Sequence, residues 1–320
     1  MKKSFLSFGV SVALCGSLYG YDYNIVDGNQ MLGAVIDIKD MTEFDNKCVN
    51  FVYHIDYTNG ENYLVHNANQ TLSGYDDLTQ LNQGQGFIVN ATGSCKVTIQ
   101  DPIVFKGYTY STIKSPTTGK TWLDRNLGAT KVCDKKRSEF ASNLDYENSQ
   151  KDCFGDYYQW GRKADGHQLK TSLTDTSLLG SLTNTNTYFI LNNSASTYYD
   201  WVSSSPTDID IKGTKRSDIW GKTTDGTSVC PAGFRVPTIG ELEKEGADIN
   251  TLVNVLKFPL SGVRAYYTNS IYGKGGYGSV WSDTPSYNYY ANAYNIREDS
   301  SNTLTGVERA SGRSIRCIKN

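Results

Sequence analysis

The stretch Cys230-Pro-Ala-Gly-Phe-Arg-Val-Pro-Thr238-Ile-Gly-Glu241-Leu242 combines three structural signals. A Pro-Ala-Gly turn leads into the short run 234–236, and Pro237 ends that run because its ring fixes φ and disfavours helical geometry in the preceding residue. Thr238 and Glu241 then have the spacing of a capping box, in which each side chain hydrogen-bonds a backbone N–H that the helix start leaves free. The stretch therefore predicts a short strand, a rigid corner and a capped helix. None of these signals is catalytic.

Other segments accompany this stretch in a fixed order along the chain. They are Gly119–Gly128, Cys153–Arg162, Phe258–Arg264, Gly278–Pro285 and Ser314–Ile318. With these segments the chain resembles the Fibrobacter succinogenes major paralogous domain, a bacterial extracytoplasmic family, over roughly residues 103–320. The resemblance implies an α+β, C-type-lectin-like fold with long loops. It implies little about function, because lectin-like scaffolds host many unrelated binding roles.

The composition favours a loop-rich extracytoplasmic protein. The chain has 320 residues, which suits two domains of about 100–200 residues each. Its formal net charge is −2, and lysine and arginine are scattered, so no basic stripe indicates nucleic acid as a partner. Tyrosine (23) and glycine (30) are abundant, whereas histidine (3) is scarce. This profile is more typical of a β-rich exported protein than of a helical cytosolic enzyme.

The first twenty residues have the pattern of a signal peptide. Two lysines precede the apolar segment Phe5–Leu18, and the small Gly20 marks a cleavage position. The apolar segment is too short to span a bilayer, and no later run approaches the ~20 apolar residues that a transmembrane segment requires. Cys15 is an alternative lipid-attachment site, although the large residue before it disfavours lipidation. We therefore expect an exported protein in the periplasm, on the cell surface or outside the cell.

Six cysteines remain after removal of the signal peptide, an even number that predicts disulfides in an oxidising compartment. Six cysteines allow 15 connectivities, which the domain division reduces. Two cysteines lie alone in the first domain, and the others would tie the Pro-Ala-Gly turn to the last strand and close the loop before the first helix. The predicted pairs are Cys48–Cys95, Cys230–Cys317 and Cys133–Cys153. A metal site is disfavoured, because no Cys-x-x-Cys occurs and histidines are few.

Residues 21–101 form the first predicted domain, a small β-rich module. Residues 50–55 and 61–65 have strand composition, and the Asn59-Gly60 pair between them favours a hairpin turn. A further strand follows at 84–89. Its Gly-x-Gly is too weak to indicate a nucleotide-binding loop, because no helix pattern follows it.

The second predicted domain, residues 102–320, begins with strands at 103–105 and 108–110. In lectin-like folds the first and last strands pair, and the bridge from Cys230 to Cys317 would fix that closure. Apolar residues spaced as on one helix face predict two helices besides the capped one. These residues are Phe154, Tyr157, Tyr158 and Gly161, within 152–161, and Ile249, Leu252, Val253 and Leu256. Between them lies a polar segment, 170–229, which we expect to be an ordered loop insertion anchored by Trp201 and Trp220.

Tyrosines and glycines concentrate in the segment 265–278 and just after it. The resemblance places the long loop region of the fold here, and that region usually carries binding. Tyrosine is large, rigid and tipped with a hydroxyl, so it can stack on sugar rings or fill a protein interface. The alternative is that these side chains only cover the loops as a local core. The candidate ligand-binding residues are Tyr266, Tyr267, Tyr272, Tyr277, Tyr287 and Tyr289.

Two kinds of chemistry are weighed against simple binding. Trp281-Ser282-Asp283 is similar to the Trp-Asn-Asp calcium element of sugar-binding lectins, but Ser282 lacks the amide carbonyl and residues 265–278 contain no carboxylate. The Gly233–Glu241 segment is similar to the helix entry of formylglycine-generating enzymes, which need reactive cysteines. Cys230 and Cys317 are better explained as a structural bridge. Arg125 and Asn126, in the matched segments, are expected to hydrogen-bond loops to the sheet. We predict neither a metal, nor a cofactor, nor catalytic residues.

The sequence thus predicts an exported protein with a small β-rich domain and a C-type-lectin-like α+β domain. We expect non-catalytic binding or adhesion through the loop tyrosines, with a glycan or a surface protein as partner. The alternatives are a structural component of a surface or matrix and an oxidase of the formylglycine-generating type.

Overall fold

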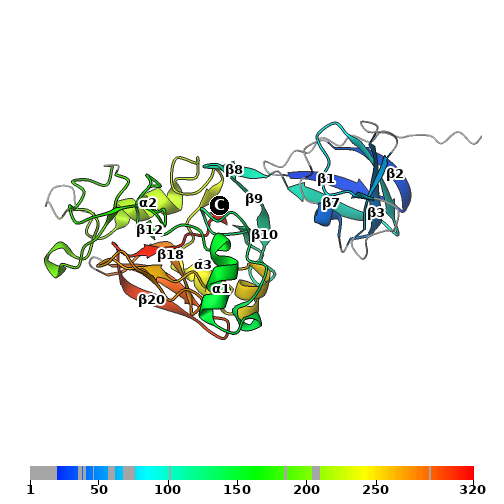
Figure 1. The fold of residues 1–320 in the computed structure, drawn as a ribbon. Helices are drawn as coiled ribbons and strands as arrows, with labels where there is room; N and C mark the ends of the chain where they lie inside the picture. Colours follow the sequence, from blue (N-terminus) through cyan, green and yellow to red (C-terminus); the bar gives the residue numbers. More distant parts are fainter. Residues whose placement is uncertain are drawn as a thin grey trace, which may run out of the picture. The chain divides into compact units, whose positions relative to one another are not determined.

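The computed structural model describes residues 20–34, 38, 41–45, 47–56, 62–67, 76–100, 102–183, 186–203, 210–287 and 290–320. Within these ranges the fold is mixed α+β, with many short strands and few helices (Figure 1). The chain divides into two compact units, residues 1–103 and 104–320. Residues 1–19 of the expected signal peptide and the Asn59-Gly60 turn lie outside the described residues. No helix in the described part of the chain is both long and apolar enough to cross a membrane.

The first unit is built from strands. A five-stranded sheet has the order β2-β6-β3-β4-β5, and β1 pairs with β7. The strands are β1 Gly20–Ile25, β2 Gly28–Gly33, β3 Val49–Asp56, β4 Asn62–His66, β5 Asp76–Asp77, β6 Gly86–Ala91 and β7 Cys95–Gln100, and a 3-10 turn η1 spans Met41–Phe44. The antiparallel pairing of β3 with β4 confirms the predicted hairpin strands. Alternate residues of β6 are buried, so Phe87 and Val89 enter the core while the residues between them face outward.

The second unit contains several small sheets and short helices. The strands are β8 Ile103–Phe105, β9 Tyr108–Tyr110, β10 Thr112–Lys114, β11 Thr121–Leu123, β12 Tyr158–Gln159, β13 Thr174–Asp175, β14 Phe189–Ile190, β15 Phe234–Arg235, β16 Val263–Arg264, β17 Ile271–Tyr272, β18 Gly278–Pro285, β19 Tyr290–Ile296, β20 Ser301–Glu308, β21 Gly312–Arg313 and β22 Ile318–Lys319. The helices are α1 Asn143–Gln150, α2 Thr214–Lys222, α3 Ile239–Gly246 and the π-helix η5 Thr251–Val255, with 3-10 turns η2 Arg137–Glu139, η3 Lys151–Cys153 and η4 Ala195–Thr197.

Three sheets organise this unit. Two have four strands, in the orders β10-β11-β22-β15 and β12-β21-β16-β17, and the third is the antiparallel sheet β18-β19-β20. Helix α3 packs against β18, β19 and β20 (Figure 1). The last strand, β22, lies between β11 and β15, so it does not pair with β8, the first strand. The expected pairing of first and last strands is therefore replaced by pairing with β11, because β8 and β9 form a sheet of their own.

The stretch that begins at Cys230 forms the predicted strand, corner and helix. Strand β15 pairs with β22, and α3 begins after Thr238. The Glu241 backbone N–H donates to the Thr238 hydroxyl (3.2 Å), and the Thr238 backbone N–H donates to the Glu241 carboxylate (2.9 Å), which completes the capping box. Arg235 adds an ion pair with Glu241 (2.6 Å). This part of the prediction is confirmed.

The three predicted disulfides are all formed. The Cα atoms are 5.7 Å apart in Cys48–Cys95, 5.2 Å in Cys133–Cys153 and 6.0 Å in Cys230–Cys317, all within the usual range. Disulfides are typical of oxidising, extracytoplasmic compartments. We expected the Cys133–Cys153 bridge to close a loop that precedes the first helix. The loop that it closes instead contains the first helix, α1.

The prediction of a helix over 152–161 is wrong. Helix α1 ends at Gln150, and the residues after η3 lead into the strand β12. Gly155 has φ +75°, and an added Cβ there would lie 2.4 Å from the Leu127 carbonyl oxygen, so the chain turns sharply at this point. Phe154 and Tyr158 are nevertheless buried. Their spacing therefore reflects burial of an irregular segment from several sides.

The later helical pattern is confirmed, although the helix is a π-helix. Leu252 and Leu256 are fully buried beside Trp122 and Leu242, and Val253 packs against the same cluster. Trp201 and Trp220 are likewise fully buried, so the polar insertion is anchored as expected. The insertion also contains α2, which the polar composition concealed.

Buried arginines hold the irregular segments of the second unit. Six arginines are at most 6% exposed, namely Arg162, Arg216, Arg264, Arg309, Arg313 and Arg316. Arg316 donates to the carbonyls of Leu256 (2.7 Å) and Leu123 (3.3 Å), and Arg264 to that of Leu169 (3.0 Å). Loops cannot pair their own backbone carbonyls as sheets do, and one guanidinium offers five donors. Five of the six arginines therefore donate to loop carbonyls that no strand pairs, whereas Arg313 donates to the Ser279 hydroxyl.

Candidate functional site

Five tyrosines lie in continuous ring contact on the second unit. Their ring centroids are 5.0 Å apart for Tyr267 and Tyr266, 5.7 Å for Tyr266 and Tyr199, 6.5 Å for Tyr199 and Tyr290, and 6.4 Å for Tyr290 and Tyr287. The pair Tyr199–Tyr290 is stacked, and the other pairs are edge-to-face. Both arrangements are favoured by aromatic quadrupoles. We call these five residues the tyrosine row.

The tyrosine row is assembled from three distant segments. Tyr199 follows η4 in the polar insertion, Tyr266 and Tyr267 follow β16, and Tyr287 and Tyr290 lie at the turn from β18 to β19. The sequence predicted Tyr266, Tyr267 and Tyr287 as site residues but missed Tyr199 and Tyr290. No local pattern could have supplied Tyr199, because it joins the others only through the fold.

Backbone hydrogen bonds fix the centre of the row. The Asn192 backbone N–H donates to the Tyr266 carbonyl (2.7 Å), and the Ala310 backbone N–H donates to the Tyr199 carbonyl (3.0 Å). Tyr266 also packs against a core cluster that includes the fully buried Trp201. The centre of the row is therefore anchored to the core of the unit and is not a set of free side chains.

Tyr199 has an unusual backbone. Its φ is 52°, in the left-handed region that residues with a Cβ rarely adopt, and Tyr198 beside it has a φ of 59°. Such conformations cost of order 1 kcal/mol or more each and concentrate at functional sites. The strain places the Tyr199 ring between Tyr266 and Tyr290.

The two ends of the row are open to solvent. Tyr267 is 51% exposed and Tyr287 is 71% exposed, whereas Tyr266, Tyr199 and Tyr290 are half-buried. Rings supported on one side and open on the other offer contact area at a low cost in conformational entropy. The row therefore has the form of a rigid aromatic ridge.

One carboxylate lies beside the ridge. Glu308, the last residue of β20, is directly opposite Tyr290 in the antiparallel pair of β19 and β20. Burial raises the pKa of Tyr266 and of Tyr290, and the Glu308 carboxylate raises both further. The two hydroxyls therefore stay protonated at neutral pH and can donate hydrogen bonds. Among the described residues the Glu308 carboxylate has no ion pair or hydrogen-bond donor.

The remaining predicted tyrosines do not extend the row. Tyr272 is 45% exposed, while Tyr277 is half-buried with its ring against Gly273, where an added Cβ would lie 2.2 Å from a ring carbon. Burial is the main cause that raises the pKa of Tyr277 to about 12, with Tyr272 contributing. No ring contact between described residues joins this pair to the row. Tyr289 lies outside the described residues.

The glycines near these tyrosines are structural. Gly275 has φ +74°, and an added Cβ there would lie 2.6 Å from the Asn143 carbonyl oxygen. Lys274 forms an ion pair with Glu147 of α1. The segment 273–276 is therefore a tight turn packed against α1.

The Trp281-Ser282-Asp283 element takes part in internal packing. Trp281 is fully buried, and its indole N–H donates to the Tyr158 carbonyl (2.7 Å). The Ser282 hydroxyl donates to the Asn292 carbonyl (2.9 Å). Across the ranges that the structure describes, no group of three or more His, Cys, Asp or Glu side chains could hold a metal ion.

Arg125 and Asn126 connect loops, as the sequence indicated. The Arg125 Nε donates to the Ala129 carbonyl (3.1 Å), and the Asn126 amide donates to the Phe154 carbonyl (3.1 Å). Asn126 in turn accepts a hydrogen bond from Arg316 (3.0 Å).

The chain matches no family model, and it has no significant match among curated proteins or solved structures. The chemistry of the site therefore rests on its own geometry.

Proposed function

We propose that this protein is a non-catalytic, extracytoplasmic binding protein that recognises a glycan through the tyrosine row. The observation that carries the proposal is the continuous contact of five tyrosines, which ends in two exposed rings and has the Glu308 carboxylate opposite Tyr290. Aromatic ring faces suit the apolar C–H faces of sugars, and a carboxylate accepts hydrogen bonds from sugar hydroxyls. The site needs no metal ion.

The proposal includes the C-type-lectin-like fold and the resemblance to the Fibrobacter succinogenes major paralogous domain. The two disulfides within the second unit support such a closed, loop-rich scaffold. Export of the protein is part of the same proposal, and the three disulfides support it.

A structural role in a surface or matrix is the second candidate. The observation that favours it is the partial burial of Tyr266, which packs against the core cluster around Trp201. In that case the tyrosines of the row would only cover the core cluster and would bind no ligand. An oxidase of the formylglycine-generating type would need reduced Cys230 and Cys317. Titration of free thiols in the oxidised protein tests it, and two reactive thiols would overturn the disulfide-stapled binder proposed above.

A glycan-array screen of the mature protein, with calcium and again with chelator, tests the proposed function. We expect reproducible hits that persist in chelator. The double variant Tyr267→Ala/Tyr287→Ala should lose about tenfold or more in affinity, because each exposed ring contributes of order 1 kcal/mol. Glu308→Gln should weaken the same hits while keeping the shape of the site.

Tyr188→Ala is the matched control. Tyr188 is 39% exposed on the same unit but does not belong to the row. It should leave binding unchanged. A blank array with well-folded protein, or equal losses in the control and in the double variant, would reject glycan binding at the row.

A further inference from the structure

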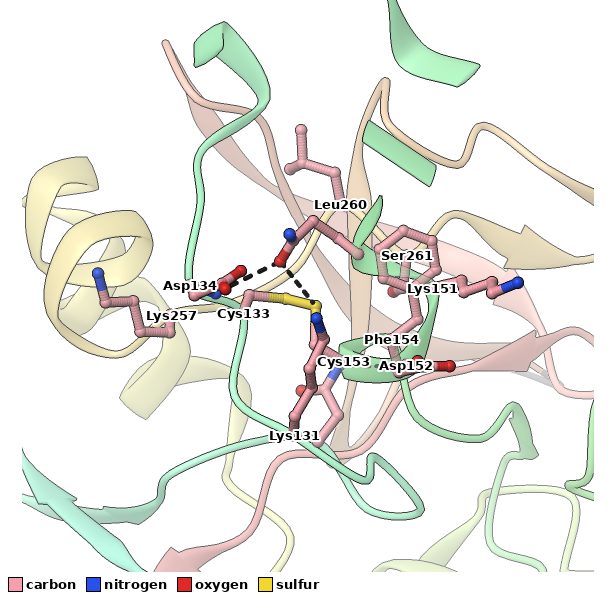
Figure 2. The surroundings of a disulfide bond; sticks show 12 residues. Lys131, Cys133, Asp134, Lys151, Asp152, Cys153, Phe154, Lys257, Leu260 and Ser261 are labelled. Atoms are coloured by element: carbon pink, nitrogen blue, oxygen red, sulfur yellow. Dashed lines mark hydrogen bonds between the residues drawn. A yellow bond between two sulfur atoms is a disulfide. The ribbon is translucent and has the colours of Figure 1, made fainter. Parts of the chain in front are cut away.

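A small cavity lies beside the Cys133–Cys153 bridge. Its volume is about 20 Å³, and Tyr146, Phe258 and Leu260 form its apolar wall. Four cationic residues surround it, namely Lys135, Lys136, Arg137 and Lys257. Figure 2 shows Lys257, Leu260 and Asp134 around the disulfide. The sequence places three of these cations in one run, but Lys257 joins them only in the folded chain.

The charges around the cavity are unbalanced. Among the residues that line the cavity, four are cationic and one, Glu298, is a carboxylate, whose two oxygens both accept the Ser138 backbone N–H (3.0 and 2.9 Å). The Asp134 and Glu139 carboxylates lie next to these cations in the chain but are not among the lining residues. Within the described part of the chain, the ammonium groups of Lys136 and Lys257 have no ion pair and no hydrogen-bond acceptor. Like charges that line one cavity repel one another. A bound anion would remove that repulsion.

The cations are held in place by the surrounding structure. The disulfide ties Cys133 to Cys153, and the Lys136 backbone N–H donates to the Glu139 carboxylate (2.7 Å). Arg137 donates from Nε to Asn143 (2.5 Å), which orients the guanidinium. Lys257 has a φ of 54°, in the left-handed region. The Arg137 guanidinium and the backbone that carries Lys136 and Lys257 are therefore arranged before any ligand arrives, which lowers the cost of binding.

We propose that this cavity binds a single tetrahedral oxyanion, a phosphate or sulfate group, with Lys136 and Lys257 as its principal ligands. One water requires about 10–15 Å³ of cavity, so a cavity of about 20 Å³ is too small to enclose a sugar ring, and an oxyanion would place one or two oxygens in it and keep the others toward solvent. A compact pocket suits a single anionic group better than a nucleic-acid backbone, which needs a long basic groove. The oxyanion can be free or carried on a polysaccharide or lipid headgroup. The proposal does not rest on glycan binding by the tyrosine row.

Calorimetric titration with inorganic phosphate and inorganic sulfate, at constant ionic strength, tests the proposal on the mature protein. We expect saturable binding to the unmodified protein. Lys136→Gln/Lys257→Asn should weaken it about tenfold or more, because charge-assisted hydrogen bonds are lost. Asparagine is used at position 257 because it tolerates a positive φ. The control Lys212→Gln/Lys215→Gln removes the same net charge from exposed lysines of the same unit and should bind normally.

Equal weakening in both double variants, or no saturable binding of either anion, would overturn the proposal. The single variant Lys136→Gln should show a smaller loss, and it keeps the test valid if the double variant unfolds. Dextran sulfate and phosphatidylglycerol vesicles then separate the sources. Binding to either that fails in Lys136→Gln/Lys257→Asn, but not in the control, supports the pocket and identifies which carrier presents the anion.

Discussion

The closure region and the tyrosine row differ in how the chain builds them. The closure region consists of β15, α3 and β22 with the Cys230–Cys317 bridge, and it is built from one continuous stretch and the last strand. The tyrosine row draws on three segments, and its members lie up to 91 positions apart, from Tyr199 to Tyr290. The first region buries Phe234, Leu242 and Ile318 in the core, whereas the second keeps two rings exposed.

This difference separates stability from recognition. Residues of the closure region satisfy backbone groups and fill the core, so their loss should destabilise the second unit. The exposed rings of the row fill no core, so their loss should affect binding alone. All five tryptophans lie in the second unit, and their fluorescence therefore reports its unfolding.

The largest expected effect is the loss of the closure disulfide. Cys230→Ala/Cys317→Ala should lower the free energy of unfolding by about 4–5 kcal/mol, because the bridge closes a loop with a sequence separation of 87. Cys133→Ala/Cys153→Ala, with a separation of 20, should lose about 3 kcal/mol. Urea unfolding followed by tryptophan fluorescence measures both. A larger loss in the second variant would contradict the assignment of closure to Cys230–Cys317.

Asp283 gives the closure region a pH dependence. Burial raises the pKa of this carboxyl to about 6, and its backbone N–H donates to the Pro237 carbonyl (2.9 Å). The folded state thus binds a proton that the unfolded state releases near pH 4, so this contribution to stability is lost as pH rises from about 4 to 6. Asp283→Asn removes the loss. The free energy of unfolding of this variant, relative to that of the unmodified protein, should rise by up to about 3 kcal/mol between pH 4 and pH 7. Thermal melts at the two pH values measure this rise. If the stability difference between the variant and the unmodified protein is the same at both pH values, Asp283 is not the source of the pH dependence.

The helix cap should have a smaller effect. Thr238→Ala removes the hydroxyl that accepts the Glu241 backbone N–H and should cost about 1 kcal/mol. Thr238→Ser retains the hydroxyl and serves as the control. Burial alone would raise the pKa of Glu241, but hydrogen bonds from Arg235 and Thr238 outweigh it and lower the pKa to about 2. An equal loss in both Thr238 variants would mean that the cap contributes little.

The smallest effect on stability is expected at the ends of the tyrosine row. Tyr267→Ala and Tyr287→Ala should each change the free energy of unfolding by less than about 0.5 kcal/mol, because both rings are largely exposed. The same urea experiment measures them. A loss above about 1 kcal/mol in either variant would show that the row is part of the core and would favour the structural role.

Local sequence signals predicted the elements that form within a few residues of one another. Thr238 and Glu241 meet because a capping box spans only three positions, and Leu252 and Leu256 share a face because the helix period brings them there. The same reasoning failed at Phe154, where helical spacing came from an irregular buried segment turned by Gly155. The spacing of apolar residues predicts which side chains are buried. It predicts a helix only where the backbone can adopt helical geometry.

The cysteine count and the division of the chain determined Cys48–Cys95, because the first unit holds only these two cysteines after the expected signal peptide. The four cysteines of the second unit allow three pairings, and the observed one agrees with the expected bridge from the Pro-Ala-Gly turn to the last strand. Which tyrosines form the row, and which lysines surround the cavity, was decided only by the tertiary structure. Tyr199 and Lys257 reach their partners through backbone in the left-handed region, held there by contacts from distant segments. Sequence patterns report local geometry, whereas these sites depend on packing between segments that no local pattern encodes.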